Sequence, residues 1–132
     1  MPAFQLLLEG NQTSFDVVLP AQVNNVTHFH WKAGVVRFNQ AVAGDVYGME
    51  IQIPCLKHFY QINSSTSRTS VIIPLSTDSK TTYFYPDIVF VGEPLSNTMK
   101  INLLRPSTGQ AFSDTGGAQI QYVFLLFEYS EE

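Results

Sequence analysis

The sequence is poor in cysteine and in charged residues. Cys55 is the single cysteine among 132 residues, so no disulfide can form within the chain. A small domain without disulfides favours assembly inside the cell. Charged residues make up only 14% of the chain, whereas soluble domains average about 25%. Covering such a surface strips few charges of water, so the composition fits contact with other protein. A neutral β surface rich in Thr and Asn accounts for it equally well.

Basic clusters and long apolar runs are also missing. The seven Lys and Arg residues are scattered and the net charge is −4, which argues against binding to nucleic acid or to an anionic membrane. No stretch approaches the roughly 20 apolar residues of a membrane helix. The start of the sequence, MPAFQLLLEG, has no basic residues before its short apolar run. We therefore expect neither a signal peptide nor a membrane partner.

Short segments of alternating apolar and polar residues fill the chain, and Gly or Pro separates them about every ten residues. No window has a helical period, and the pattern indicates strands. Gly34 is expected to mark a bulge or bend, and residues 55–59 a short helical turn. We expect one all-β domain over residues 1–132, an antiparallel two-sheet sandwich of about eight strands. The expected strands are 4–8, 15–19, 28–38, 47–53, 71–73, 82–85, 88–91, 99–103 and 120–129.

The last of these segments is apolar on both faces. In QIQYVFLLFEY, residues 119–129, Ile120, Tyr122 and Phe124 alternate with Val123 and Leu125. One face of a sandwich strand packs in the core, so the other face needs a second cover. The loops of the chain are short and polar, which favours a neighbouring subunit as that cover. The candidate interface residues are Tyr83, Tyr85, Tyr122, Phe124, Leu125, Phe127 and Tyr129.

Five strings carry a resemblance to a known group of proteins: SFDVVLP, HFHWKAGVVRF, YGMEIQIP, TMKINLLRPSTGQAF and FEYSEE. In this order the chain resembles the single jelly-roll minor capsid and penton-type proteins of double-stranded DNA viruses, virophages and related mobile elements. The resemblance implies a single jelly roll and a structural virion role of minor capsid, vertex or cement type. It also implies no catalysis, no cofactor and assembly in the host cytoplasm or nucleus. The expected partners are further copies, in trimers or pentamers, and other capsid proteins.

A binding module is the first alternative. Tyr83, Phe84 and Tyr85 lie together in TTYFYPD, residues 81–87, and exposed aromatic rings stack on sugars or contact protein. A lectin-like or cytokine-like trimer would present such residues to a glycan or a receptor. Packing in the core or at an interface accounts for the same residues, so both interpretations stay open.

A cupin-like metal-binding protein is the second alternative. His28 and His30 project to the same side of a strand and could both reach one metal, with His58 as a third ligand. The carboxylate that a cupin carries shortly after this pair is absent from WKAG, so structural surface histidines remain the default. Cys55 lies three residues before His58 but is expected to be an inert thiol. With no G-x-S-x-G elbow, we expect no enzyme, although cupin-like activity stays open.

Overall fold

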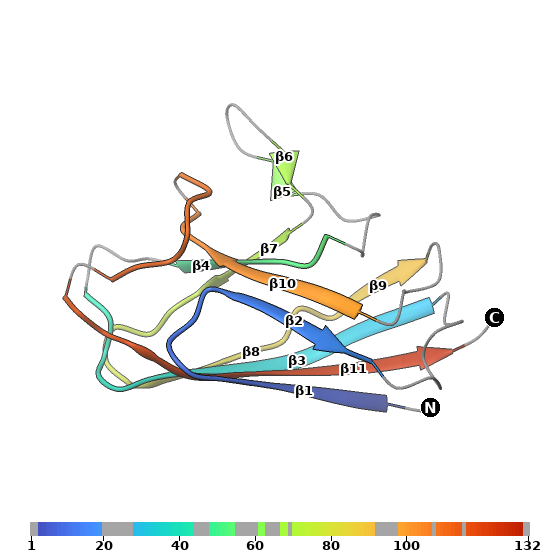
Figure 1. Ribbon diagram of the computed structural model, residues 1–132, viewed down its shortest axis with the longest axis horizontal. Helices are drawn as coiled ribbons and strands as arrows, with labels where there is room; N and C mark the ends of the chain where they lie inside the picture. Colours follow the sequence, from blue (N-terminus) through green and yellow to red (C-terminus); the bar gives the residue numbers. More distant parts are fainter. Residues whose placement is uncertain are drawn as a thin grey trace.

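The computed structural model describes residues 3–19, 28–43, 48–54, 61–62, 67–68, 70–91, 98–106, 108–114 and 116–130. Within these ranges the chain forms strands and no helix. Two antiparallel sheets face each other, one below the other in Figure 1. The expectation of an all-β, two-sheet antiparallel domain is therefore confirmed.

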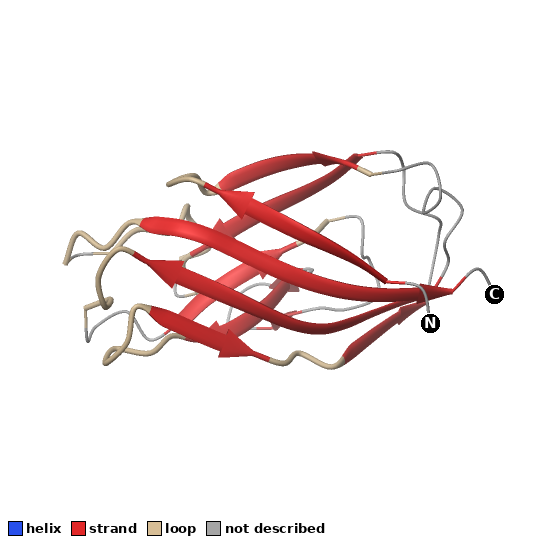
Figure 2. Ribbon diagram, turned by 90° about the horizontal axis from the view of Figure 1, so that it is seen from below, coloured by secondary structure: helices blue, strands red, loops and turns tan. Residues whose placement is uncertain are grey.

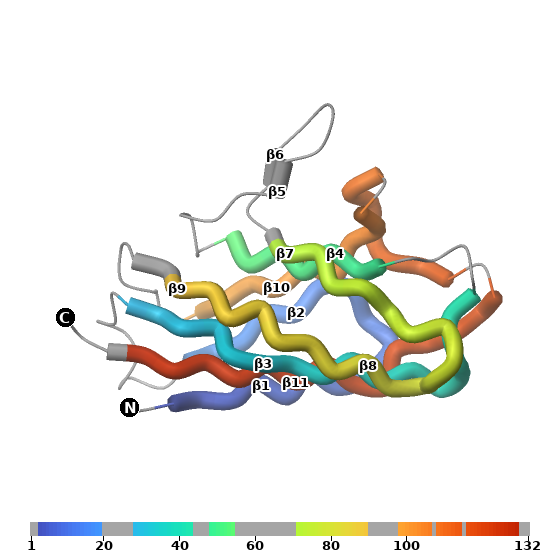
Figure 3. The backbone as a smooth tube through the Cα atoms, turned by 180° about the vertical axis from the view of Figure 1, so that it is seen from behind, coloured from blue at the N-terminus to red at the C-terminus, as the bar shows by residue number. Residues whose placement is uncertain are grey.

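The larger sheet, here called the β11 sheet, contains the two ends of the described chain. Its strand order is β1 (Ala3–Glu9), β11 (Ile120–Ser130), β3 (His28–Phe38) and β8 (Thr81–Phe84), and β9 (Ile88–Val91) also pairs with β3. β8 and β9 lie one after the other along β3, as Figure 3 shows. Each of the expected strands in these regions is present within one or two residues.

The second sheet, here called the β10 sheet, covers one face of the first. Its order is β2 (Ser14–Val18), β10 (Thr98–Leu104), β4 (Gly48–Gln52) and β7 (Ser70–Pro74). A separate pair consists of β5 (Gln61–Ile62) and β6 (Ser67–Arg68). The helical turn expected at residues 55–59 lies outside the described residues.

The core fills the space between the sheets and follows the alternation of each strand. Met49, Ile51, Ile101 and Leu103 from the β10 sheet are fully buried. In the β11 sheet three aromatic rings form a continuous stack. The ring of Phe127 lies 5.2 Å from that of Phe4 and 5.6 Å from that of Trp31, measured between centroids. Large buried apolar side chains from the central strands of both sheets therefore make up the core.

Two irregularities shift the register between β3 and β11. Leu126 pairs with Ala33 and Phe127 with Trp31, so Lys32 is the extra residue of a bulge. The bend expected at Gly34 thus lies two residues earlier. A second shift separates Ile120 from Tyr122. Ile120 is consequently buried in the core, and the expectation that it shares a face with Tyr122 is wrong.

Candidate functional site

The outer face of the β11 sheet carries a row of apolar side chains across four strands. Leu7 of β1 pairs with Phe124 of β11, Phe124 with Val35 of β3, and Val35 with Tyr83 of β8. Residues paired in this way place their side chains next to each other on one face of a sheet. Leu7 is 56% exposed and Tyr83 67% exposed, while Val35 and Phe124 are half-buried.

Two further side chains widen this row along β11. Leu126 follows Phe124 on the same face and pairs with Ala33, and Tyr122 precedes it and pairs with Arg37. Figure 2 sees this sheet from outside, and no described segment crosses it. We call the following set the apolar patch: Leu7, Val35, Tyr83, Tyr122, Phe124 and Leu126. A contiguous exposed apolar patch of this kind usually marks a site of interaction with another molecule.

The opposite outer face, on the β10 sheet, carries a row of polar side chains, and Val18 in β2 is its exposed large apolar residue among those described. The Ser14 hydroxyl donates to Asn102 Oδ1 over 3.1 Å, and Asn102 Nδ2 donates to Gln52 Oε1 over 3.0 Å. These hydrogen bonds link β2, β10 and β4. The two outer faces therefore differ in chemistry, and the apolar one is the candidate site.

The structure divides the residues expected at an interface into two groups. Tyr83, Tyr122 and Phe124 lie in the apolar patch, and Tyr85 is exposed just after β8. Leu125 and Phe127 point the other way, into the core, where both are 0% exposed. Because successive side chains of a strand alternate between faces, these two cannot contact a partner in this fold.

Tyr129, also expected at the interface, packs against the core side of the sheet. Its ring centroid lies 5.8 Å from that of Phe4, and its side chain is half-buried. Leu7, Val35 and Leu126 belong to the patch but were not among the candidates. Leu7 could have been recognised, because it is an apolar residue at a position where alternation calls for a polar one.

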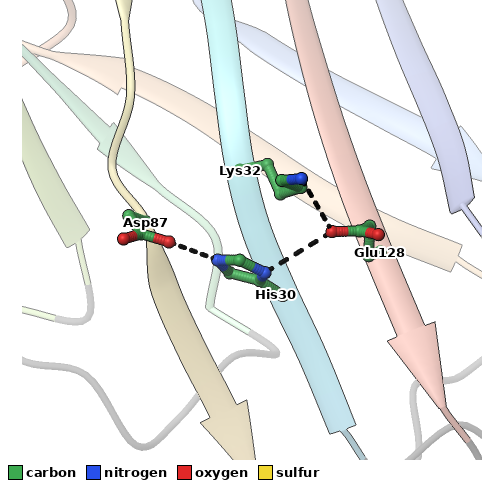
Figure 4. A network of polar contacts seen from close by, with 4 residues as sticks. All are labelled: His30, Lys32, Asp87 and Glu128. Carbon is green, nitrogen blue, oxygen red and sulfur yellow. Dashed lines mark hydrogen bonds and ion pairs between the residues drawn. The ribbon is translucent and has the colours of Figure 1, made fainter. Parts of the chain in front are cut away.

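A charged cluster borders the apolar patch (Figure 4). His30 Nε2 lies 2.5 Å from Asp87 Oδ1, and His30 Nδ1 lies 3.6 Å from Glu128 Oε1. The same oxygen of Glu128 lies 3.2 Å from Lys32 Nζ. His30 and Lys32 come from β3, Glu128 from β11 and Asp87 from the segment between β8 and β9. We call these four residues the His30 cluster.

Backbone conformation and register place these charged groups. Glu128 pairs with His30 across β11 and β3. Lys32 lies two residues after His30 and projects from the same face of β3, so that its ammonium reaches the same carboxylate. Asp87 has φ of 51°, in the left-handed region that aspartate tolerates better than most residues. That turn carries its exposed carboxylate over the imidazole.

Among the residues that the structure describes, those considered as metal ligands do not form a coordination site. His28 lies on the same face as His30, but no group of three potential ligands with suitable geometry occurs among the residues that the structure describes. His58 and Cys55 lie outside that part of the chain. The cupin-like alternative therefore gains no geometric support from the described histidines.

Comparison with protein-family models, with curated proteins and with solved structures found no match. Among the described residues there is no helix of the length and apolarity needed to cross a membrane. The candidate site is an apolar face formed by four strands, bordered at one side by two carboxylates, an imidazole and an ammonium.

Proposed function

We propose that this chain is a self-associating structural subunit that uses the apolar patch to bind further copies of itself. The observation that carries the proposal is the uncovered row Leu7, Phe124, Val35 and Tyr83. Burying a large apolar side chain that starts fully exposed stabilises an association by about 1.5–3 kcal/mol, and the half-buried members of the patch contribute less. Six neighbouring residues can therefore offset a substantial part of the entropy lost when two copies associate.

We further propose that the sandwich is a single jelly roll. Without β5 and β6, and with β8 and β9 counted as one interrupted strand, the described part of the chain has eight strands in sequence order. The first pairs with the last (β1–β11), the second with the seventh (β2–β10), the third with the sixth (β3–β8 and β9), and the fourth with the fifth (β4–β7). A long hairpin folded over into two sheets has this pairing, and the jelly roll is such an arrangement.

Together, the proposed fold and the proposed association fit a capsid-type subunit of minor capsid, vertex or cement type. Jelly-roll units occur in viral shells, and symmetric closure of one repeated contact yields rings such as trimers or pentamers. The short strings that resemble minor capsid and penton-type proteins support the same assignment. In this proposal other shell proteins are the further partners, the virion is the location, and no catalysis is needed.

A binding module for a glycan or a receptor is the second candidate. Tyr83 and Tyr85 are 67% and 74% exposed and lie two residues apart at the end of β8. Exposed aromatic rings of this kind can stack on a sugar ring. Here a ligand would occupy the edge of the apolar patch that the self-association proposal assigns to a second copy.

The oligomeric state in solution tests the proposal. Light scattering coupled to size exclusion is expected to show a mass above that of a monomer, and Leu7→Glu is expected to reduce it. Val18→Glu is the matched control, because Val18 is 77% exposed but lies in β2 on the other sheet. A strictly monomeric protein at high concentration, or equal effects of the two substitutions, would contradict the proposal.

The type of assembly and the alternative need separate measurements. Electron microscopy is expected to show closed rings in wild type and none in Leu7→Glu; disordered aggregates would count against a capsid-type subunit. A glycan array probed with wild type and Tyr83→Ser tests the second candidate. Sugar binding that Tyr83→Ser removes, in a protein that stays monomeric, would favour the binding module.

A further inference from the structure

We infer that the His30 cluster makes self-association through the apolar patch dependent on pH, with tighter association when His30 is protonated. This inference rests on the proposed self-association and assigns it a form of regulation. It is carried by the position of one imidazole between two carboxylates at the border of the patch (Figure 4).

The two ring nitrogens of His30 face different carboxylates. Nε2 lies against Asp87 and Nδ1 towards Glu128. A neutral imidazole has one N–H and one lone pair, so it can donate to only one of them. Its other nitrogen then presents a lone pair to a carboxylate oxygen. The imidazolium has two N–H groups and can satisfy both carboxylates at once.

Protonation also changes the net charge of the cluster. With a neutral imidazole, the carboxylates of Asp87 and Glu128 outnumber the single ammonium of Lys32, which leaves one negative charge. With an imidazolium the cluster is neutral overall. An excess charge is costly to cover when an interface removes it from water.

The cluster is close enough to the apolar patch to be covered with it. Glu128 follows Leu126 of the patch on the same face of β11, and Val89, which pairs with His30, is itself exposed. A second copy seated on Leu126 therefore lies over or beside His30. Changing the charge of this residue consequently alters the free energy of association.

Several other titratable groups of the described chain lie around His30 on the same outer face. Those that face it are Asp87 beside β9, Glu128 on β11, and Lys32 and His28 on β3. Carboxylates and lysine ordinarily change charge well below and well above neutral pH. His28 is the other histidine on this face of β3 among the described residues. It lies two residues further from Leu126 along β3, which makes it the natural control.

The test measures the association constant by analytical ultracentrifugation at about pH 7.5 and 5.5, which span the ordinary titration of histidine. Wild type is expected to associate about tenfold more tightly at the lower pH, as expected for removing an interfacial charge. His30→Asn is expected to keep the weaker constant at both pH values. His28→Asn is expected to retain the pH dependence.

Asp87→Asn provides a second variant with little risk to the fold. Asp87 is 78% exposed, and asparagine also tolerates its positive φ. Because this substitution removes the excess negative charge, association at neutral pH is expected to rise towards the low-pH level of wild type. It should also be less pH-dependent.

The outcomes separate the two proposals. Self-association that Leu7→Glu abolishes but that does not vary with pH would overturn this inference and leave the proposed function standing. Full pH dependence in the His30→Asn variant would likewise overturn this inference and leave the proposed function standing. A protein that is monomeric at both pH values would overturn both.

Discussion

The ring of Phe84 lies directly against the backbone of Gly34. The two residues pair across β8 and β3, and a Cβ on Gly34 would come within 2.2 Å of Phe84 Cζ and 2.9 Å of the Phe124 carbonyl oxygen. Glycine is therefore required at this position, because Phe84 fills the space that any side chain would need.

Gly34→Ala is expected to destabilise the fold by about 1–3 kcal/mol, the usual cost of overpacking a core. Urea denaturation measures the free energy of unfolding. The double variant Gly34→Ala/Phe84→Leu should cost less than the sum of its single variants, because the smaller leucine makes room for the new methyl group. Simple additivity would contradict the assigned contact.

Substitution of Phe124 and of Phe127 tests which face of β11 packs in the core and which lies on the outside of the sheet. Phe127→Ala is expected to cost about 3–5 kcal/mol, because it leaves a cavity in the aromatic stack. Phe124→Ala should cost about 1 kcal/mol or less, since Phe124 is partly exposed in a single copy. Denaturation should be done at low protein concentration, where association adds nothing to stability. Equal costs would show that the two faces are wrongly assigned.

Asn102 links three strands on the outside of the β10 sheet through Ser14 and Gln52. Asn102→Ala is expected to destabilise the fold by about 1–2 kcal/mol, because it removes both hydrogen bonds from a half-buried position. Lys100→Ala, on the same face of β10 but exposed, should stay within about 0.5 kcal/mol of wild type. Thermal unfolding of the two variants side by side is the measurement.

The hydrogen bonds of Asp114 lead us to expect that the folded protein loses stability in acid. Burial alone would raise the pKa of its carboxyl, but hydrogen bonds from the backbone amides of Ala118 (2.9 Å) and Ala43 (3.0 Å) outweigh this. The pKa therefore lies below its ordinary 3.8. A carboxyl group whose pKa is lower in the folded protein than in the unfolded protein stabilises the fold. This stabilisation is fully present above the pKa of the unfolded protein and is lost as the pH falls through the pKa of the folded protein.

Asp114→Ala should thus cost about 1 kcal/mol at neutral pH, a small value because the carboxylate is partly exposed. The difference from wild type should vanish as the pH falls through the lowered pKa of Asp114. Thermal unfolding followed from neutral pH into the acid range measures both stabilities. A difference that stays constant with pH would contradict the ionic character of these hydrogen bonds.

Much of the strand pattern could be predicted from sequence, because alternation and Gly or Pro boundaries are local signals. Residues 28–38 and 120–129 were recognised as strands on that basis. The face assignment failed where a bulge adds a residue, as at Ile120, because nothing in the local sequence marks that shift. Glu50 shows a different limit: β4 keeps its register and its alternation, yet Glu50 is 0% exposed on the face opposite Met49 and Ile51.

The site was harder to predict than the strands. An apolar excess on the last strand was visible in its own sequence, but the row also needs Leu7, Val35 and Tyr83, which only strand pairing brings together. The contact between His30 and Asp87 joins segments that lie far apart in the chain. No local pattern reveals which side chain a loop carboxylate such as Asp87 will meet.

The pairing of β1 with β11 has a consequence for synthesis in the cell. Ala3 aligns with Glu128, so the earliest described strand acquires its neighbour only after residues 120–130 have left the ribosome. Contacts between such distant segments slow folding. Until β11 is in place, the apolar side chains of β1 and β3 lack the packing that this strand provides in the folded protein. Nascent chains stalled before residue 120 should therefore bind chaperones and be cut readily by proteases, whereas released full-length chains should resist both.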